Sequence, residues 1–227
     1  MNIAEKLTAI GENQHAIYGA GKRAEYDAFW DVFQTNGNRT NYQSAFTVGW
    51  DDTNYNPKYP IIAGASGGLV GVFASNAGIT DTKVPITAYG SCQAAFSYAK
   101  VKKIPKIIFT TDVTNVTYMF NSCNQLEEMY CEGTIAITGI DLHWSTKLNK
   151  ASILSIINVL DDVVHEGTDA DPTNKLTLSL TAVNNAFYQV PTYNEYGDIE
   201  VEECVGSESH EWNALVADKS NWSIVLI

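Results

Sequence analysis

The sequence predicts an α/β fold, in which short parallel strands wind into a right-handed solenoid between an N-terminal helix and C-terminal strand–helix units. Three observations predict it. Between residues 40 and 140, Phe follows Ala, Val or Met at four places, Phe46, Phe73, Phe96 and Phe120, at intervals of 27, 23 and 24 residues. A short β-prone segment recurs between these sites. Apolar residues at helical spacing occur in both terminal parts of the chain.

The repeated units are too short to form separate cores. The β-prone segments are residues 59–62, 84–87 and 104–109, and residues 126–131 have apolar residues at LxxLxL spacing. A unit of this size cannot bury its apolar face alone, so successive units stack and share one core. The pattern predicts that Phe73, Phe96 and Phe120 form a buried ladder. The alternative is an ordinary α+β domain in which the Phe spacing is coincidental.

The residues around the last two Phe sites carry a family resemblance. Residues 95–97, 119–123 and 124–126 read Ala-Phe-Ser, Met-Phe-Asn-Ser-Cys and Asn-Gln-Leu. These motifs resemble the BspA-like leucine-rich repeats of gut and oral bacteria, in which Ala-Phe or Met-Phe is often followed by Cys, Leu and a short Ile-Pro strand. The resemblance covers residues 40–142 and departs in the long first unit, where the segment Gly64–Gly68 replaces the expected polar turn residues. It implies a leucine-rich repeat solenoid.

A second resemblance concerns the whole chain. The opening residues 3–7 and 20–30, the degenerate repeats and the acidic C-terminal part together resemble proteins encoded in prophage tail regions of gut bacteria. This resemblance carries no catalytic residues. It implies a structural or binding role in a particle or surface assembly.

The N-terminal region is expected to form a helix over residues 1–36. Ile3, Ile10, Ile17 and Ala24 recur every seven residues, and Gly37 suits a left-handed C-cap. Heptad spacing is compatible with a coiled-coil seam, which would make residues 3–34 a surface for homo-oligomerisation. The alternative is a helix that packs on its own domain.

The C-terminal part is expected to form larger strand–helix units that continue and cap the repeat. The predicted strands are residues 139–143, 176–180 and 222–227. The predicted helices are residues 150–164, 181–187 with Thr181 as N-cap, and 208–219. An acidic excursion over residues 190–206 separates the last two helices. The resulting domain division is 1–36 for the N-terminal helix, 37–142 for the repeats and 143–227 for the capping units.

The net charge of −12 is concentrated in one part of the chain. Residues 1–150 hold 12 basic and 13 acidic residues, whereas residues 151–227 hold 2 basic and 13 acidic residues. Such a chain is a poor match for nucleic acid, which requires a basic face. The acidic excursion is expected to flank a partner site for a cationic protein, with Glu200, Glu202 and Glu203 as the candidate partner-binding residues. The alternative is that the negative charge serves solubility alone.

The sequence offers little catalytic or metal-binding chemistry. The four histidines are scattered, no paired CxxC or HExxH occurs, and Cys123 and Cys131 fit buried apolar positions. Residues 169–174 only faintly resemble a calcium loop, since the loop glycine and the distal Glu are missing. We therefore expect no catalytic residue, no cofactor and no metal site. An enzyme would instead need two convergent carboxylates, such as Asp141 with Asp161 or Glu166.

The combined expectation is a non-enzymatic protein-binding or structural module, part of a phage tail or a bacterial surface assembly. Its partner would be a protein or a surface glycan. The longest apolar run is far shorter than the roughly 20 residues of a membrane span. No signal peptide is visible, so the expected location is cytoplasmic or virion-associated. The alternatives are a cytoplasmic protein–protein adaptor built on the same repeat, and a hydrolase that uses carboxylates in the 140–210 region.

Overall fold

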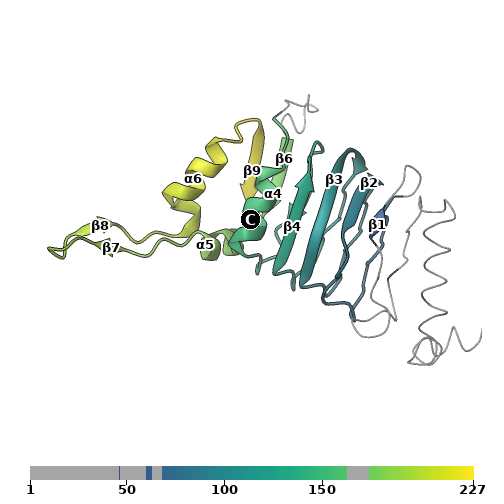
Figure 1. Cartoon of the computed structure of the whole chain (residues 1–227), viewed down its shortest axis with the longest axis horizontal. Helices are drawn as coiled ribbons and strands as arrows, with labels where there is room; N and C mark the ends of the chain where they lie inside the picture. The colour runs from purple at the N-terminus through teal and green to yellow at the C-terminus, as the bar shows by residue number, and fades with distance from the viewer. Residues whose placement is uncertain (1–45, 47–59, 63–67, 163–173) are drawn as a thin grey trace, which may run out of the picture.

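The fold comprises two parallel β-sheets, three α-helices and a projecting hairpin in the part of the chain that the structure describes (Figure 1). The structure is a computed structural model, and it describes residues 46, 60–62, 68–162 and 174–227. The predicted N-terminal helix over residues 1–36 lies outside the described residues, and so does the homo-oligomer surface assigned to residues 3–34. The α/β class with parallel sheets is confirmed. Within the described residues, no helix is long and apolar enough to span a membrane.

The larger sheet has four strands in the order of the sequence. They are β1 (Ile61–Ile62), β2 (Ile86–Ser91), β3 (Lys103–Asn115) and β4 (Glu128–Gly133), and each pairs with the next in parallel. In β2, fully buried residues alternate with half-buried ones, as expected of a strand with one face on the core. Each strand covers or overlaps one of the β-prone segments found in the sequence.

The four repeated Phe residues form one continuous stack beside this sheet. Neighbouring ring centroids are 5.1 Å apart from Phe46 to Phe73, 5.1 Å from Phe73 to Phe96, and 5.4 Å from Phe96 to Phe120. The rings are nearly parallel, with interplanar angles of 17°, 10° and 5°. All four side chains are buried. The predicted ladder of Phe73, Phe96 and Phe120 is therefore confirmed, and it extends back to Phe46.

Backbone hydrogen bonds join the turns that carry these Phe residues, in the same pattern from one turn to the next. The N–H groups of Phe73 and Phe96 donate to the carbonyl oxygens of Ala95 and Met119, both at 2.8 Å. The same pattern recurs two positions before and two positions after each Phe. There the backbone N–H donates to a carbonyl oxygen of the next turn: Gly71 to Gln93, Ser75 to Ser97, Ala94 to Thr117, and Tyr98 to Asn121. The turns therefore stack in register, as the strands do.

Each of three successive turns contains two residues in the left-handed region, placed two residues before and two after the Phe. These pairs are Gly71 and Ser75, Ala94 and Tyr98, and Tyr118 and Ser122, with φ between 54° and 59°. Only the first pair includes a glycine. An L-residue in this region is strained by roughly 1–2 kcal/mol. Stacking therefore imposes the same left-handed conformation at these positions, whether or not the residue there is a glycine.

A polar residue three positions after the Phe ties some turns to the preceding one. The side-chain amide of Asn76 donates to the carbonyl oxygen of Phe46 at 2.8 Å, and the Cys123 thiol donates to that of Phe96 at 2.8 Å. Both side chains are buried. The Cys that follows Met-Phe in the sequence is thus a hydrogen-bond donor inside the stack.

Helix α4 (Lys150–Asn158) takes the place of a further strand beside β4. Its Ser152 and Ser155 hydroxyl oxygens accept hydrogen bonds from the N–H groups of Met129 and Cys131, at 2.8 and 2.5 Å. Asn149 caps the helix by accepting from the N–H of Ser152. An open strand edge exposes unpaired backbone groups. At β4 the two serines satisfy the backbone N–H groups of Met129 and Cys131.

The smaller sheet contains β5 (Ile140–Leu142), β6 (Asn174–Leu178) and β9 (Trp222–Leu226), all parallel and in that order. Helix α5 (Leu180–Ala186) follows β6. The short helix η2 (Gly206–Glu208) and helix α6 (His210–Ala217) precede β9. These are the strand–helix units that the sequence predicts.

Three predicted details of these units are wrong. The N-cap of α5 is Ser179, whose hydroxyl accepts from the N–H of Ala182, and Thr181 is inside the helix. Leu180 belongs to the helix and not to the preceding strand. Helix α4 ends at Asn158 because Leu160 leaves the helix to form a parallel bridge with Ile135.

The stacked ladder predicts a large stability loss for Phe96→Ala, because the ring is completely buried between two others. We expect the free energy of unfolding to fall by roughly 3–5 kcal/mol. The exposed Tyr98→Ala serves as control and should change it by less than about 0.5 kcal/mol. Denaturant unfolding measures both. Equal effects of the two substitutions would contradict the ladder.

The left-handed turn residues predict opposite effects at two equivalent positions. Ala94→Gly should stabilise the chain by up to about 1 kcal/mol, since relief of strain exceeds the added entropy of the unfolded chain. Gly71→Ala should destabilise it by a similar amount, because Gly71 has a φ of 57°. Thermal unfolding of both variants checks this. A destabilised Ala94→Gly protein would show that the turn is unstrained.

Candidate functional site

The acidic excursion of the sequence forms a two-stranded hairpin that projects from the body of the molecule (Figure 1). Strands β7 (Thr192–Tyr193) and β8 (Ile199–Val201) pair antiparallel. Between them, the side-chain oxygen of Asn194 accepts from the N–H groups of Tyr196 and Asp198, both at 2.9 Å, and Gly197 has a φ of 83°. We call residues 188–205 the acidic arm. An isolated hairpin of this length is marginally stable in water.

The three predicted partner-binding carboxylates all lie on the acidic arm. Glu200 is on β8, and Glu202 and Glu203 follow it; all three are exposed. The Tyr188 hydroxyl donates to the carboxylate of Glu203, and this hydrogen bond raises the pKa of Tyr188. The carboxylates line a projecting surface, so they are available to a partner and not to a substrate held in a cleft.

Apolar side chains on the acidic arm are also exposed. Tyr196 at the tip is 80% exposed, and Val190, Tyr193 and Ile199 are each more than half exposed. Sequence reasoning singled out only the acidic residues. The signal for the hairpin was present, since Asn194 and Gly197 are turn-forming residues between two short β-prone segments. The arm combines negative charge with aromatic and aliphatic surface, a composition suited to protein contacts.

The base of the acidic arm is anchored on the body. Gln189 and Cys204 form an antiparallel bridge at its start. Beyond it, Gly206 approaches the backbone of Val183 in α5 so closely that a Cβ atom would overlap the carbonyl oxygen. Phe187 packs against Trp212 of α6, with ring centroids 5.2 Å apart. The arm therefore projects in a direction fixed by its base.

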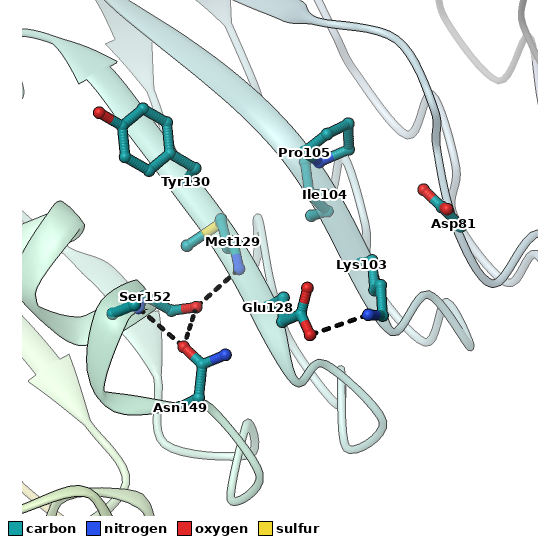
Figure 2. A pocket seen from close by; sticks show the side chains of 10 residues that line it. Asp81, Lys103, Ile104, Pro105, Glu128, Met129, Tyr130, Asn149 and Ser152 are labelled. Carbon is teal, nitrogen blue, oxygen red and sulfur yellow. Dashed lines mark hydrogen bonds and ion pairs between the residues drawn. The ribbon is translucent and has the colours of Figure 1, made fainter.

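An open pocket of about 260 Å³ lies between β3, β4 and the start of α4 (Figure 2). Lys103 donates to Glu128 across it at 2.8 Å, and this bond raises the pKa of Lys103. Ser152 and Asn149 line the opposite wall and are hydrogen-bonded to each other, and the Ser152 hydroxyl oxygen also accepts from the backbone N–H of Met129. The Lys103 ammonium is thus paired with a carboxylate of the neighbouring strand.

A cluster of four lysines, Lys100, Lys102, Lys103 and Lys106, includes the Lys103 that lines this pocket. Lys100 and Lys102 are exposed. Lys103 and Lys106 pair with Glu128 and Glu132 on the neighbouring strand, at 2.8 and 2.6 Å. Exposed pairs of this kind contribute little to stability.

Asp141 and Asp161 of the hydrolase hypothesis make hydrogen bonds to different residues. The Asp141 carboxylate accepts from the backbone N–H of His143 at 3.0 Å and lies 2.6 Å from its ring Nδ1. Asp161 follows α4, and its carbonyl oxygen accepts from the indole N–H of Trp222. Glu166 lies outside the described residues, as do residues 169–173 of the calcium-loop candidate. Among the residues that are described, no group of three or more His, Cys, Asp or Glu could hold a metal ion.

The cysteines occupy apolar surroundings, as the sequence predicts for Cys123 and Cys131. Both are buried, and so is Cys92. Burial raises the thiol pKa of each from 9.0 to about 12. Cys204, at the base of the acidic arm, is only partly buried.

Comparison with known proteins gives no relative on which to base an assignment. No protein-family model, no curated protein and no solved structure matches the chain. The functional argument therefore rests on the residues and their geometry.

The buried thiols predict selective labelling. In the folded protein at pH 8, a maleimide should modify Cys204 alone, and the other three cysteines should react only after denaturation. Mass spectrometry counts the labels. Labelling of Cys92 or Cys123 in the folded protein would contradict their burial.

The raised pKa values also predict that the free energy of unfolding falls as the pH rises from about 9 towards 12, because the unfolded chain then loses thiol protons that the folded chain retains.

Proposed function

We propose that the chain is a non-enzymatic protein-binding or structural module, built as a leucine-rich repeat solenoid of the BspA-like kind and belonging to a phage tail or bacterial surface assembly. The observation that carries the binding role is the acidic arm. It projects from the body and exposes carboxylates together with large apolar side chains. Exposed apolar surface rimmed by charge is typical of interaction sites.

The solenoid part of the proposal is supported by the repeat in the turns. Turn spacing, Phe stacking, left-handed positions and inter-turn hydrogen bonds recur together at residues 71–75, 94–98 and 118–122. Repeats of this kind stack by nearest-neighbour contacts and offer extended surfaces to partners. The cytoplasmic adaptor remains the alternative, and it would use the same surfaces in another location.

The charge of the acidic arm defines the class of partner. The arm holds five carboxylates, Glu195, Asp198, Glu200, Glu202 and Glu203, and contains no Lys or Arg. Such a surface attracts a cationic protein and repels nucleic acid and anionic membranes. Exposed charges of this kind act chiefly on the rate of association.

Zero-length carbodiimide cross-linking tests this proposal, because the reagent joins carboxylates to lysines in direct contact. Extract from the source organism is treated, and cross-linked peptides are identified by mass spectrometry. We expect Glu200, Glu202 or Glu203 to be joined to lysines of one predominant protein. Cross-links scattered over many unrelated proteins, or absent from the acidic arm, would contradict the proposal.

A matched pair of variants then measures the contribution of the arm. Glu200, Glu202 and Glu203 are changed together to Gln, and the control changes Glu127, Glu128 and Glu132 to Gln, which removes the same charge from the other sheet. The first variant should slow association with the cross-linked protein more than it accelerates dissociation. The difference in association rate between this variant and the wild type should decline as added salt shortens the Debye length from roughly 30 to 8 Å. If the control variant slows association equally, the net charge of the chain and not the acidic arm sets the rate, and this would contradict the proposal.

A further inference from the structure

Strand β9 has an open edge in the part of the chain that the structure describes. It is the last strand of its sheet, and only β6 is paired with it there. The N–H of Ile227 donates to the carbonyl oxygen of Leu178, and the carbonyl oxygen of Ile227 accepts from Leu180. Since alternate residues of a parallel strand face opposite neighbours, the backbone groups of Ile224 and Leu226 face the open side.

The apolar core of this sheet extends to β9, but the side chains of β9 are less buried than those of the other two strands. Two rows of side chains cross the sheet in register: Ile140, Leu176 and Ile224, and then Leu142, Leu178 and Leu226. The first two members of each row are buried, whereas Ile224 and Leu226 are only partly buried.

The composition of β9 indicates that this edge is not protected. Residues 222–227 contain no charged residue and no proline, which are the usual means of keeping an edge unpaired. The edge of β9 therefore lacks the cover that Ser152 and Ser155 give to β4.

The acidic arm projects from the same end of the molecule (Figure 1). It follows α5, whose first residue, Leu180, is hydrogen-bonded to Ile227 just after β9. In Figure 1 it extends beyond β9, away from the four-stranded sheet. An apolar strand edge and a negatively charged projection thus occur together.

We propose that an extended, basic segment of another protein adds as a further strand to the open edge of β9, with its Lys or Arg side chains directed to the carboxylates of the acidic arm. The inference rests on the proposed binding function and names the form of the partner. Strand addition supplies main-chain hydrogen bonds, and alternate side chains supply specificity. Apolar residues of the segment would continue the rows that end at Ile224 and Leu226.

Charge complementarity selects this occupant over a second copy of the chain. Two copies that paired through β9 would bring two acidic arms, each with five carboxylates and no basic residue, to one interface. Like charges across an interface are unfavourable. A basic segment instead neutralises the acidic arm.

The first experiment selects binders from a displayed library of random 12-residue peptides against the full chain at low salt. We expect the selected peptides to be rich in Lys or Arg, to alternate these with β-branched or aromatic residues, and to lack proline. Selected peptides without basic enrichment, or with proline throughout, would overturn the proposal.

Hydrogen exchange on the wild-type chain then locates the bound peptide. The amides of Ile224 and Leu226 should become at least tenfold better protected when the selected peptide is added, whereas those of Met129 and Cys131 should not change. A peptide that binds without protecting Ile224 and Leu226 does not add to β9, and this result would overturn the proposal. Wild-type protein is used, so the result does not depend on the folding of a variant.

Substitutions separate the two parts of the site. Leu226→Lys places a charge on the edge and should weaken peptide binding at least tenfold, as should changing Glu200, Glu202 and Glu203 to Gln. The Glu127, Glu128 and Glu132 to Gln control should retain binding within about threefold. Retained binding in both site variants would contradict strand addition. Thermal unfolding confirms that each variant is folded before it is compared.

The outcome is distinguishable from failure of the proposed function. Cross-links from the acidic arm to one partner, combined with unprotected β9 amides, would retain the binding role and reject strand addition. Protection of Ile224 and Leu226 in the chain alone, with a dimeric mass by sedimentation, would identify a second copy as the occupant and overturn the basic-segment proposal.

Discussion

The stack of Phe46, Phe73, Phe96 and Phe120 is the interaction on which the rest of the structure depends. Each ring is buried by the next one, so no single turn has a complete core. The backbone bonds between turns keep the same register as the rings. This mutual dependence explains how Ala94 and Tyr118 remain in a left-handed conformation that favours glycine.

The last strand of each parallel sheet is important in the same way, since a last layer leaves apolar groups and a strand edge uncovered. After β4, the chain supplies a helix whose Ser152 and Ser155 hydroxyls satisfy the edge. After β9, the described chain supplies no equivalent cover. The contrast between these two edges gives the acidic arm a structural context, because the arm projects from the same end of the molecule as the edge that lacks cover (Figure 1).

Periodic features of the fold could be predicted from the sequence, whereas features set by tertiary contacts could not. The Phe ladder and the parallel strands follow from spacing alone. The end of α4 does not, because Leu160 has the spacing of the helix but bridges to Ile135. Ser179 and Thr181 are both good N-caps, and the end of β6 decides between them. Of the candidate site, the sequence indicated the carboxylates of the acidic arm but neither its exposed apolar residues nor the contact between Asp141 and His143.

A double-mutant cycle between stacked rings tests the central claim most directly. Phe73→Leu and Phe96→Leu, singly and together, should give a coupling energy of about 0.5–1.5 kcal/mol in denaturant unfolding, because the rings are in contact. Phe73→Leu combined with Phe120→Leu should give almost none, since another ring separates them. A coupling near zero for the neighbouring pair, or equal coupling for both pairs, would contradict a stack held together ring by ring.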